Sequence, residues 1–224
     1  MPREDYQERL NELREDVVDM ADLVLERFDS ALTALREDDE DIAWDVIHGD
    51  AEVNEMYLDV EQACVDLIAL QQPVAGDLRL IAASFKIITD LERIGDLATN
   101  LADYTVHTGG GWTSEVEVQE IGGYAAQMVE DSVRAYAEED VDLCFEVDER
   151  DERLDEMCER SIDRVIRRLI EAGGSHGDGG VEDLMEDTTR SLVVVRDLER
   201  VGDHAVNIAA RTLYMLENDE ELIW

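Results

Sequence analysis

The chain has 224 residues, enough for one domain or two of about 110, and 45% of its residues are hydrophobic, enough for a buried core. Its 58 acidic and 19 basic residues give a net charge of −39, which excludes a basic surface for nucleic acid and disfavours contact with anionic lipid. No run reaches the roughly 18–20 apolar residues of a membrane span and no signal peptide is seen, so we expect a cytoplasmic protein without membrane insertion.

The acidity itself favours a halophilic source. Acidic composition can indicate disorder, but apolar residues recur at helical spacing along almost the whole chain, and Lys86 is the single lysine. In molar salt the Debye length is about 3 Å, so the self-repulsion of such a chain is largely screened. Most of the carboxylates are then an adaptation to solvent and carry no functional information.

Six long helices are predicted from apolar residues at steps of three and four. They cover residues 4–37, 42–70, 77–105, 115–139, 142–171 and 181–217. Pro73 and Gly76 end the second helix, Asp77 is a candidate N-cap of the third, and Ser114 with Glu117 forms a capping box for the fourth. We find no convincing strand pattern.

Two smaller expectations concern residues within these helices. The cysteines lie in apolar stripes without a CxxC motif, so we expect them to be reduced and buried: Cys64, Cys144 and Cys158. Trp44 and Phe145 occupy matching positions in the two halves, and we expect them to pack in the core or between the halves.

The chain contains an internal repeat. Residues 84–103 (SFKIITDLERIGDLATNLAD) and 191–210 (SLVVVRDLERVGDHAVNIAA) are identical at ten of twenty positions, mostly charged, amide or glycine, at a spacing of 107. The second helix of each half also repeats, at a spacing of 101. The sequence therefore predicts an all-α fold of two tandem up-down-up three-helix bundles, residues 1–107 and 115–224, joined by a glycine-rich linker at 108–114.

In the third helix of each half, oxygen-bearing side chains continue the stripe of apolar residues that faces the core. In the second helix of each half, such side chains interrupt the apolar stripe. Residues four apart lie on one helix face, and antiparallel pairing of the second and third helices of each half places the two sets opposite one another. The candidate metal ligands are Asp50, Asn54, Glu92, Asp96 and Asn100 in the first half, and Asp151, Asp155, Glu199, Asp203 and Asn207 in the second.

Carboxylates that face one another repel unless they are protonated or bridged by cations. A set without His or Cys is hard and suits Fe(III), Mn, Mg or Ca far better than Zn or Cu. Of these we expect Fe or Mn, with Mg or Ca as alternatives. The Glu-x-x-His element of ferritin-like di-iron bundles is missing, which disfavours oxygen chemistry. The other interpretation is a solvated acidic face on which Arg93 and Arg200 form weak surface pairs.

Two neighbouring features have structural interpretations. Gly95 and Gly202 weaken a mid-helix by about 1 kcal/mol each, so we expect the backbone of another helix to approach them closely. His204 points away from Asp203 on the helix, and we expect it to be structural.

At these residues the sequence resembles a known family. The twice-occurring DLERxGDxAxN, within 88–102 and 195–209, is similar to the paired signatures of the PhoU family, and QQPVAGDLRLI (71–81) resembles the segment that precedes the first signature. The resemblance covers nearly the whole chain. It implies two three-helix bundles and acidic motifs that bind metal clusters in some members, falling by position on Asp50/Asn54 with Glu92/Asp96 and on Asp151/Asp155 with Glu199/Asp203. Asn54 departs from the acidic pattern, which puts the charge of the first site in doubt.

The resemblance also implies a function: negative regulation of phosphate uptake by a non-enzymatic adaptor. Family members act between the ATPase subunit of the phosphate transporter and a membrane sensor kinase, and a homodimer is implied. Two alternatives stay open, a helical accessory subunit of another phosphate permease and a carboxylate-bridged metal enzyme such as a phosphatase. The absence of a recognisable nucleophile and base argues against the enzyme.

Overall fold

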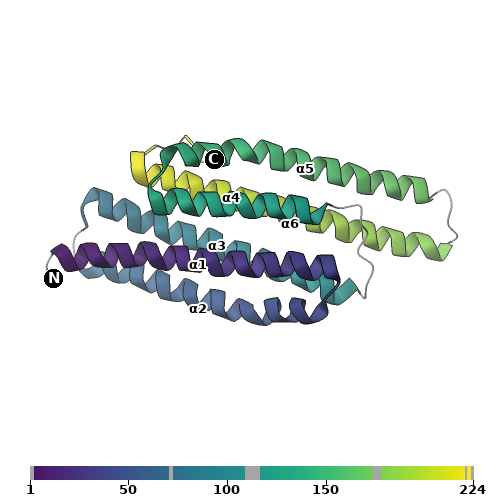
Figure 1. The fold of residues 1–224 in the computed structure, drawn as a ribbon, viewed down its shortest axis with the longest axis horizontal. Coiled ribbons are helices and arrows are strands. Elements are labelled where there is room, and N and C mark those ends of the chain that lie inside the picture. The colour runs from purple at the N-terminus through teal and green to yellow at the C-terminus, as the bar shows by residue number, and fades with distance from the viewer. Residues whose placement is uncertain (1–2, 71–72, 109–116, 174–177, 220, 223–224) are drawn as a thin grey trace.

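The computed structural model describes residues 3–70, 73–108, 117–173, 178–219 and 221–222 (Figure 1). Six helices and no strand occur in these ranges, which confirms the predicted all-α fold. The helices are α1 (Arg3–Glu37), α2 (Glu40–Leu70), α3 (Ala75–Thr108), α4 (Val118–Glu138), α5 (Val141–Gly173) and α6 (Asp178–Glu217). None of them is long and apolar enough to cross a bilayer.

Successive helices run antiparallel, so each half is an up-down-up bundle (Figure 1). α1, α2 and α3 contact one another, as do α4, α5 and α6, and the halves meet through α3 against α6 and α1 against α4. The halves are displaced along the long axis, so that the α5–α6 end extends beyond the first half (Figure 1). α1 and α4 lie nearest the viewer in Figure 1, in front of α3 and α6.

The hydrophobic core is continuous across the two halves, because buried residues of all six helices form one cluster. A buried hydrogen bond of 2.7 Å joins the hydroxyls of Ser84 on α3 and Tyr136 on α4. The three cysteines are free and buried, as predicted. Burial raises the pKa of the Cys64, Cys144 and Cys158 thiols to about 12.

The short acidic segments that join α1 to α2 and α4 to α5 are tight turns with the same construction. Asp38 and Glu139 adopt left-handed backbone conformations, and the next residue of each turn caps the following helix. Asp39 Oδ1 accepts hydrogen bonds from the backbone N–H groups of Asp41 and Ile42, and Asp140 Oδ1 accepts one from Leu143.

Two predicted helix starts were wrong. α3 begins at Ala75, which places Asp77 in its first turn and not at its N-cap. α4 begins at Val118 after Glu117, whose side chain makes no capping hydrogen bond; its carboxylate accepts two from Arg164. Ser114, and the predicted linker apart from Thr108, lie outside the described residues.

The prediction for Trp44 was also wrong. Its side chain is 42% exposed on the outer surface of α2, where it stacks on His48 one helical turn away. Phe145, at the matching position of α5, is partly buried against the core. The surroundings of the two aromatic residues therefore differ although the repeat aligns them.

Candidate metal centres

The second half places four carboxylates on facing sides of the α5–α6 groove. Burial raises the pKa of Asp151 on α5 to about 6, with further contributions from the negative charges of Asp155, Asp203, Asp148 and Glu199. Burial and neighbouring carboxylates likewise raise the pKa of Asp155 and of Glu199. The charges of Asp155, Asp203 and Glu199 all act on Asp151, so the predicted pairs, Asp151/Asp155 and Glu199/Asp203, lie near one another.

The first half has the same arrangement between α2 and α3. Burial and the charge of Asp50 raise the pKa of Asp96, and burial followed by the charge of Asp96 raises that of Glu92. Asp50 differs from its counterpart Asp151 because both of its oxygens accept hydrogen bonds. Asn54 Nδ2 donates to Oδ2 at 2.7 Å, and Thr99 Oγ1 donates to Oδ1 at 3.4 Å.

In the second half, the positions equivalent to both of these donors hold other residues. Asp155 stands where Asn54 does, and Val206 stands where Thr99 does. Asp151 Oδ1 is consequently buried without a hydrogen-bond partner. A buried carboxylate oxygen without a donor is costly, and a cation would supply the missing interaction.

Each carboxylate pair lies in a groove open to solvent and not on a core-facing edge as predicted. The stripe that leads into the first pair already includes an exposed residue, Phe85, between the buried Ile81 and Ile88. In the second half, an open hollow of about 660 Å³ adjoins the pair and is lined by Ile162, Leu192, Arg196, Glu199, Arg200 and Asp203. Asp96 and Asp203 are exposed, so cations in solution can reach a carboxylate of each pair.

The glycines beside the carboxylates accommodate side chains of the facing helix, whereas we had predicted its backbone. A Cβ at Gly95 would lie 3.2 Å from Val53 Cγ1, and one at Gly202 would lie 2.1 Å from Leu154 Cδ2 and 3.5 Å from Asp151 Oδ1. Val53 and Leu154 are repeat equivalents. Both glycines let the facing helix pack closely at the point where the carboxylates meet.

The PhoU domain model matches the chain over residues 17–105 and again over 118–212, which are the two bundles just described. The chain belongs to the PhoU family. It is 33% identical to a phosphate-specific transport system accessory protein PhoU homolog of Pseudomonas putida over 96% of this chain and 82% of that protein. It is 28% identical to the accessory protein PhoU of Escherichia coli, over 96% and 86% of the two chains.

Solved structures of the PhoU family share the fold. The crystal structure of PhoU from Pseudomonas aeruginosa matches with a TM-score of 0.86 and 30% identity, covering 96% of this chain and all of that one. The phosphate transport system regulatory protein PhoU from Streptococcus pneumoniae matches with a TM-score of 0.85, at 24% identity and coverages of 96% and 98%.

The PhoU signature divides between two helix faces, and only one of them carries the facing carboxylates. Asn207 lies at the α3–α6 contact, where its amide donates to Asp90 Oδ1 at 3.5 Å, while Asn100 is exposed on α3. His204 is buried, as expected of a structural residue, with Nδ1 2.9 Å from the same Asp90 oxygen. The structure thus places Asn207 between the halves, and its role as a metal ligand stays a prediction.

Sequence reasoning missed the polar contacts between the halves. Asp90 and its repeat equivalent Asp197 are both buried at the α3–α6 contact. The Tyr104 hydroxyl donates to Asp197 Oδ2 at 3.1 Å, and burial together with that carboxylate raises the pKa of Tyr104 to about 12. The available signal was that Asp90 is identical in both repeats but lies two residues from Glu92, on another face of the helix.

The donor set fits a hard cation, since every facing group is a carboxylate or amide oxygen and Asp151 carries an unpartnered one. Among the described residues, no three His, Cys, Asp or Glu side chains are grouped so that they could hold one ion as they stand. Binding therefore requires the facing carboxylates to turn toward a shared ion, and their exposure to solvent leaves them room to do so.

Proposed function

We propose that this PhoU-family protein is a metal-binding, non-enzymatic negative regulator of phosphate uptake. Its proposed partners are the ATPase subunit of a phosphate transporter, a membrane sensor kinase and a second copy of the chain. It acts in the cytoplasm, and its acidic surface suits a saline one. The observation that carries the proposal is the pair of facing carboxylate sets on a chain whose relatives are named phosphate transport accessory proteins.

In the proposed metal centres, Asp151, Asp155, Glu199 and Asp203 hold the ion of the second half. Asp50, Glu92 and Asp96, with the Asn54 amide oxygen, hold that of the first. A bound Fe or Mn ion supplies positive charge that joins the two helices of each groove. We place the tighter site in the second half, because Asp151 has an unpartnered oxygen whereas Asn54 and Thr99 already satisfy Asp50.

Elemental analysis of protein purified in molar salt without chelator tests the metal assignment. We expect Fe or Mn in the wild type, a large loss in Glu199→Gln/Asp203→Asn, and a smaller loss in the matched first-half variant Glu92→Gln/Asp96→Asn. Metal content that is unchanged in both variants would place the ion elsewhere. Equal losses would refute the difference between the halves.

Phosphate uptake in a strain that lacks the gene tests the regulatory role. We expect deletion to raise uptake in phosphate-rich medium, the wild-type gene to restore repression, and the second-half variant to restore it poorly. Co-purification then identifies the partner. Recovery of an unrelated permease in place of the transporter ATPase would support the accessory-subunit alternative, and phosphoester turnover by the metal-loaded protein would contradict a non-enzymatic role.

A further inference from the structure

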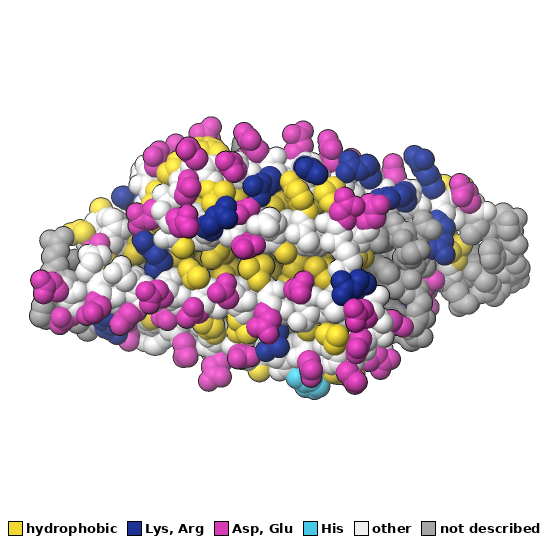
Figure 2. Space-filling model, in the orientation of Figure 1, with side chains coloured by type: hydrophobic (Ala, Val, Ile, Leu, Met, Phe, Trp, Pro, Cys, Tyr) yellow, Lys and Arg dark blue, Asp and Glu magenta, His cyan; other side chains and the backbone are white. Residues whose placement is uncertain are grey.

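One short stretch of α5 concentrates positive charge on a strongly acidic chain. Residues 160–168 carry four of the chain's 19 basic residues and a single carboxylate, Asp163. The four are Arg160, Arg164, Arg167 and Arg168. Figure 2 shows basic side chains gathered over the part of α5 that extends past the start of α4. Adaptation to a saline solvent accounts for the carboxylates of this chain but not for a local excess of arginine.

The first half has no such cluster at the equivalent place. At a spacing of 101, the counterparts of the four arginines are Asp59, Ala63, Asp66 and Leu67. The counterpart of Glu117 on α1 is Asp16, and burial and four nearby carboxylates, Asp59 among them, raise its pKa. The same place in the fold is therefore acidic in one half and basic in the other, so the arginines are not a requirement of the repeated bundle.

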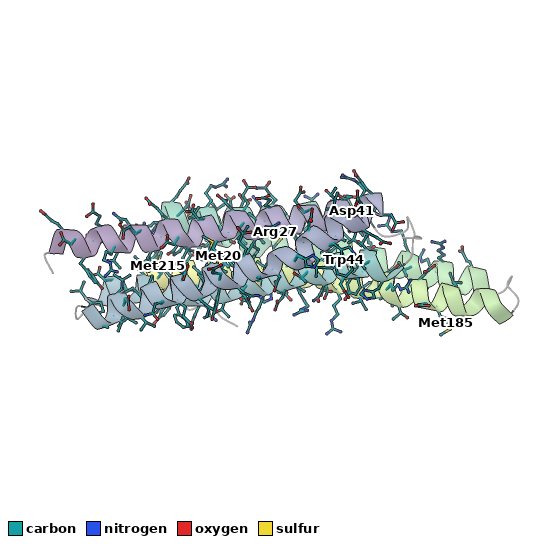
Figure 3. All side chains as sticks on the ribbon, turned by 90° about the horizontal axis from the view of Figure 1, so that it is seen from below. Met20, Arg27, Asp41, Trp44, Met185 and Met215 are labelled. Carbon is teal, nitrogen blue, oxygen red and sulfur yellow. The ribbon has the colours of Figure 1, made fainter. Side chains whose placement is uncertain are left out.

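Three of the arginines line an open hollow between α4 and α5. Its volume is about 530 Å³, and its lining residues are Glu117, Glu120, Arg160, Asp163, Arg164 and Arg167. Steps of four and three place the three arginines on one face of α5. The hollow lies at the start of α4, where the positive end of the helix dipole adds to their charge. Beyond it, α5 and α6 continue to the end of the molecule that Met185 marks in Figure 3.

An oxyanion of the protein itself, the Glu117 carboxylate, already occupies one of these arginines. Arg164 Nη1 and Nη2 donate to Glu117 Oε1 and Oε2 at 2.7 and 2.6 Å, and these hydrogen bonds lower the pKa of Glu117. Arginine binds carboxylate and phosphate with the same two-pronged geometry. Because Glu117 is exposed, exchanging its carboxylate for an anion from solution costs little.

The other two arginines keep donors that no protein group uses. Arg160 makes a long hydrogen bond of 3.3 Å to Glu156, in a pair that is exposed on both sides. Within the part of the chain that the structure describes, Arg167 forms no hydrogen bond or ion pair. Every described side chain that lines the hollow is charged. The lining therefore suits a small hydrophilic anion and offers no surface for a stacked base or an apolar group.

We propose that this hollow binds inorganic phosphate on Arg160, Arg164 and Arg167, and that the Glu117 carboxylate takes its place on Arg164 when phosphate is absent. Once Glu117 turns out to solvent, three guanidinium groups face two carboxylates and the site is positively charged. The site lies on the α4 side of α5, whereas Asp151 faces α6. Phosphate thus binds apart from the carboxylate pairs, and the inference goes beyond the proposed function by naming a ligand to which the protein responds.

The two remaining carboxylates, Glu120 and Asp163, favour phosphate over other oxyanions. An ionised carboxylate only accepts hydrogen bonds. Phosphate near neutral pH keeps at least one P–O–H group that can donate to it, whereas sulfate has no proton to donate and is repelled. Acidic groups beside the arginines therefore reject sulfate at a smaller cost to phosphate.

Equilibrium dialysis against radiolabelled phosphate tests the site, on protein stripped of metal with a chelator that is then dialysed away. We expect saturable binding, weakened about tenfold or more in both Arg160→Gln and Arg167→Gln, because each loses charge-assisted hydrogen bonds. Arg190→Gln is the matched control, since it removes the same charge from α6, where Arg190 pairs with Glu186 outside the hollow. A wild type that does not bind, or an equal loss in the control, would overturn the proposal.

Glu117→Gln distinguishes a phosphate site from a set of structural ion pairs. This variant frees Arg164 of its competing carboxylate, so we expect it to bind phosphate several-fold more tightly than the wild type. Unchanged or weaker binding would show that Glu117 does not compete with phosphate. Circular dichroism checks that each variant keeps the helix content of the wild type.

Competition between anions tests the identity of the ligand. We expect unlabelled phosphate to displace the label at a lower concentration than sulfate, and the Glu120→Gln/Asp163→Asn variant to lose this preference. Equal competition by sulfate in the wild type, or binding of tripolyphosphate without binding of phosphate, would refute the assignment to inorganic phosphate. These measurements involve neither metal nor phosphate uptake, so failure of the phosphate site and failure of the proposed function are told apart.

Discussion

Replacing Asp151 by asparagine should stabilise the metal-free protein at neutral pH. In the fold, burial and four neighbouring carboxylates raise the pKa of Asp151 from 3.8 to about 6. The folded state therefore holds this proton more tightly than the unfolded state, and the free energy of unfolding falls as the pH rises from about 4 to about 6. Asp151→Asn removes this loss.

The size of the effect follows from that shift. About two pKa units correspond to roughly 3 kcal/mol, and screening by solvent in the open groove reduces this to about 1–2 kcal/mol. For a chain of this length, each kcal/mol shifts the Tm by about 2–4 °C. We therefore expect the Tm of Asp151→Asn in EDTA to exceed that of the wild type by several degrees at pH 7, and to equal it below pH 4.

Thermal unfolding at constant ionic strength, from below pH 4 to pH 7, measures the Tm of Asp151→Asn and of the wild type. Asp50→Asn is the matched control. Both oxygens of Asp50 accept hydrogen bonds in the fold, so this variant should gain no stability. A difference between Asp151→Asn and the wild type that does not change with pH would refute the electrostatic argument. With saturating metal, the Tm of the wild type should exceed that of Asp151→Asn, because the wild type then gains the free energy of metal binding.

Three further predictions concern packing and hydrogen bonds. Gly202→Ala should lower the free energy of unfolding by about 1–2 kcal/mol, because displacing buried Leu154 outweighs the gain in helix propensity. Gly95→Ala should be neutral or stabilising. Urea unfolding of both variants compares their free energies of unfolding. Tyr136→Phe removes the hydrogen bond to Ser84 between the halves and should cost about 1 kcal/mol without changing helix content. Asp39→Ala removes the cap of α2 and should cost about 1 kcal/mol, as the equivalent Asp140→Ala should for α5, both measured by thermal denaturation.

The sequence predicted the helices and the facing carboxylates because both follow from short-range spacing. Apolar steps of three and four locate a helix, and equal distances from a hairpin turn bring Asp50 opposite Asp96. Such spacing does not show which other elements cover a face. Phe85 and Trp44 lie at helical positions that suggested burial, but among the described helices α2 contacts only α1 and α3, and both side chains are exposed.

The contact between the halves could not be predicted for a related reason. Asp90 and Glu92 are both identical in the repeat, and periodicity alone does not show that one faces α6 and the other α2. Thr99 was overlooked because its counterpart is Val206, so the repeat gave no sign that it is a hydrogen-bond donor to Asp50. The distinction between the two metal centres depends on such unmatched residues.

Encoding both bundles in one chain has a consequence for how the protein can change. In an assembly of two identical three-helix subunits, every substitution would occur twice, and the two carboxylate grooves would always have the same charge. Here Asn54 and Thr99 stand in one groove where Asp155 and Val206 stand in the other, and His204 meets Asp90 while its counterpart position holds Leu97. Duplication within one chain thus gives a nearly symmetric molecule two sites that selection can adjust separately.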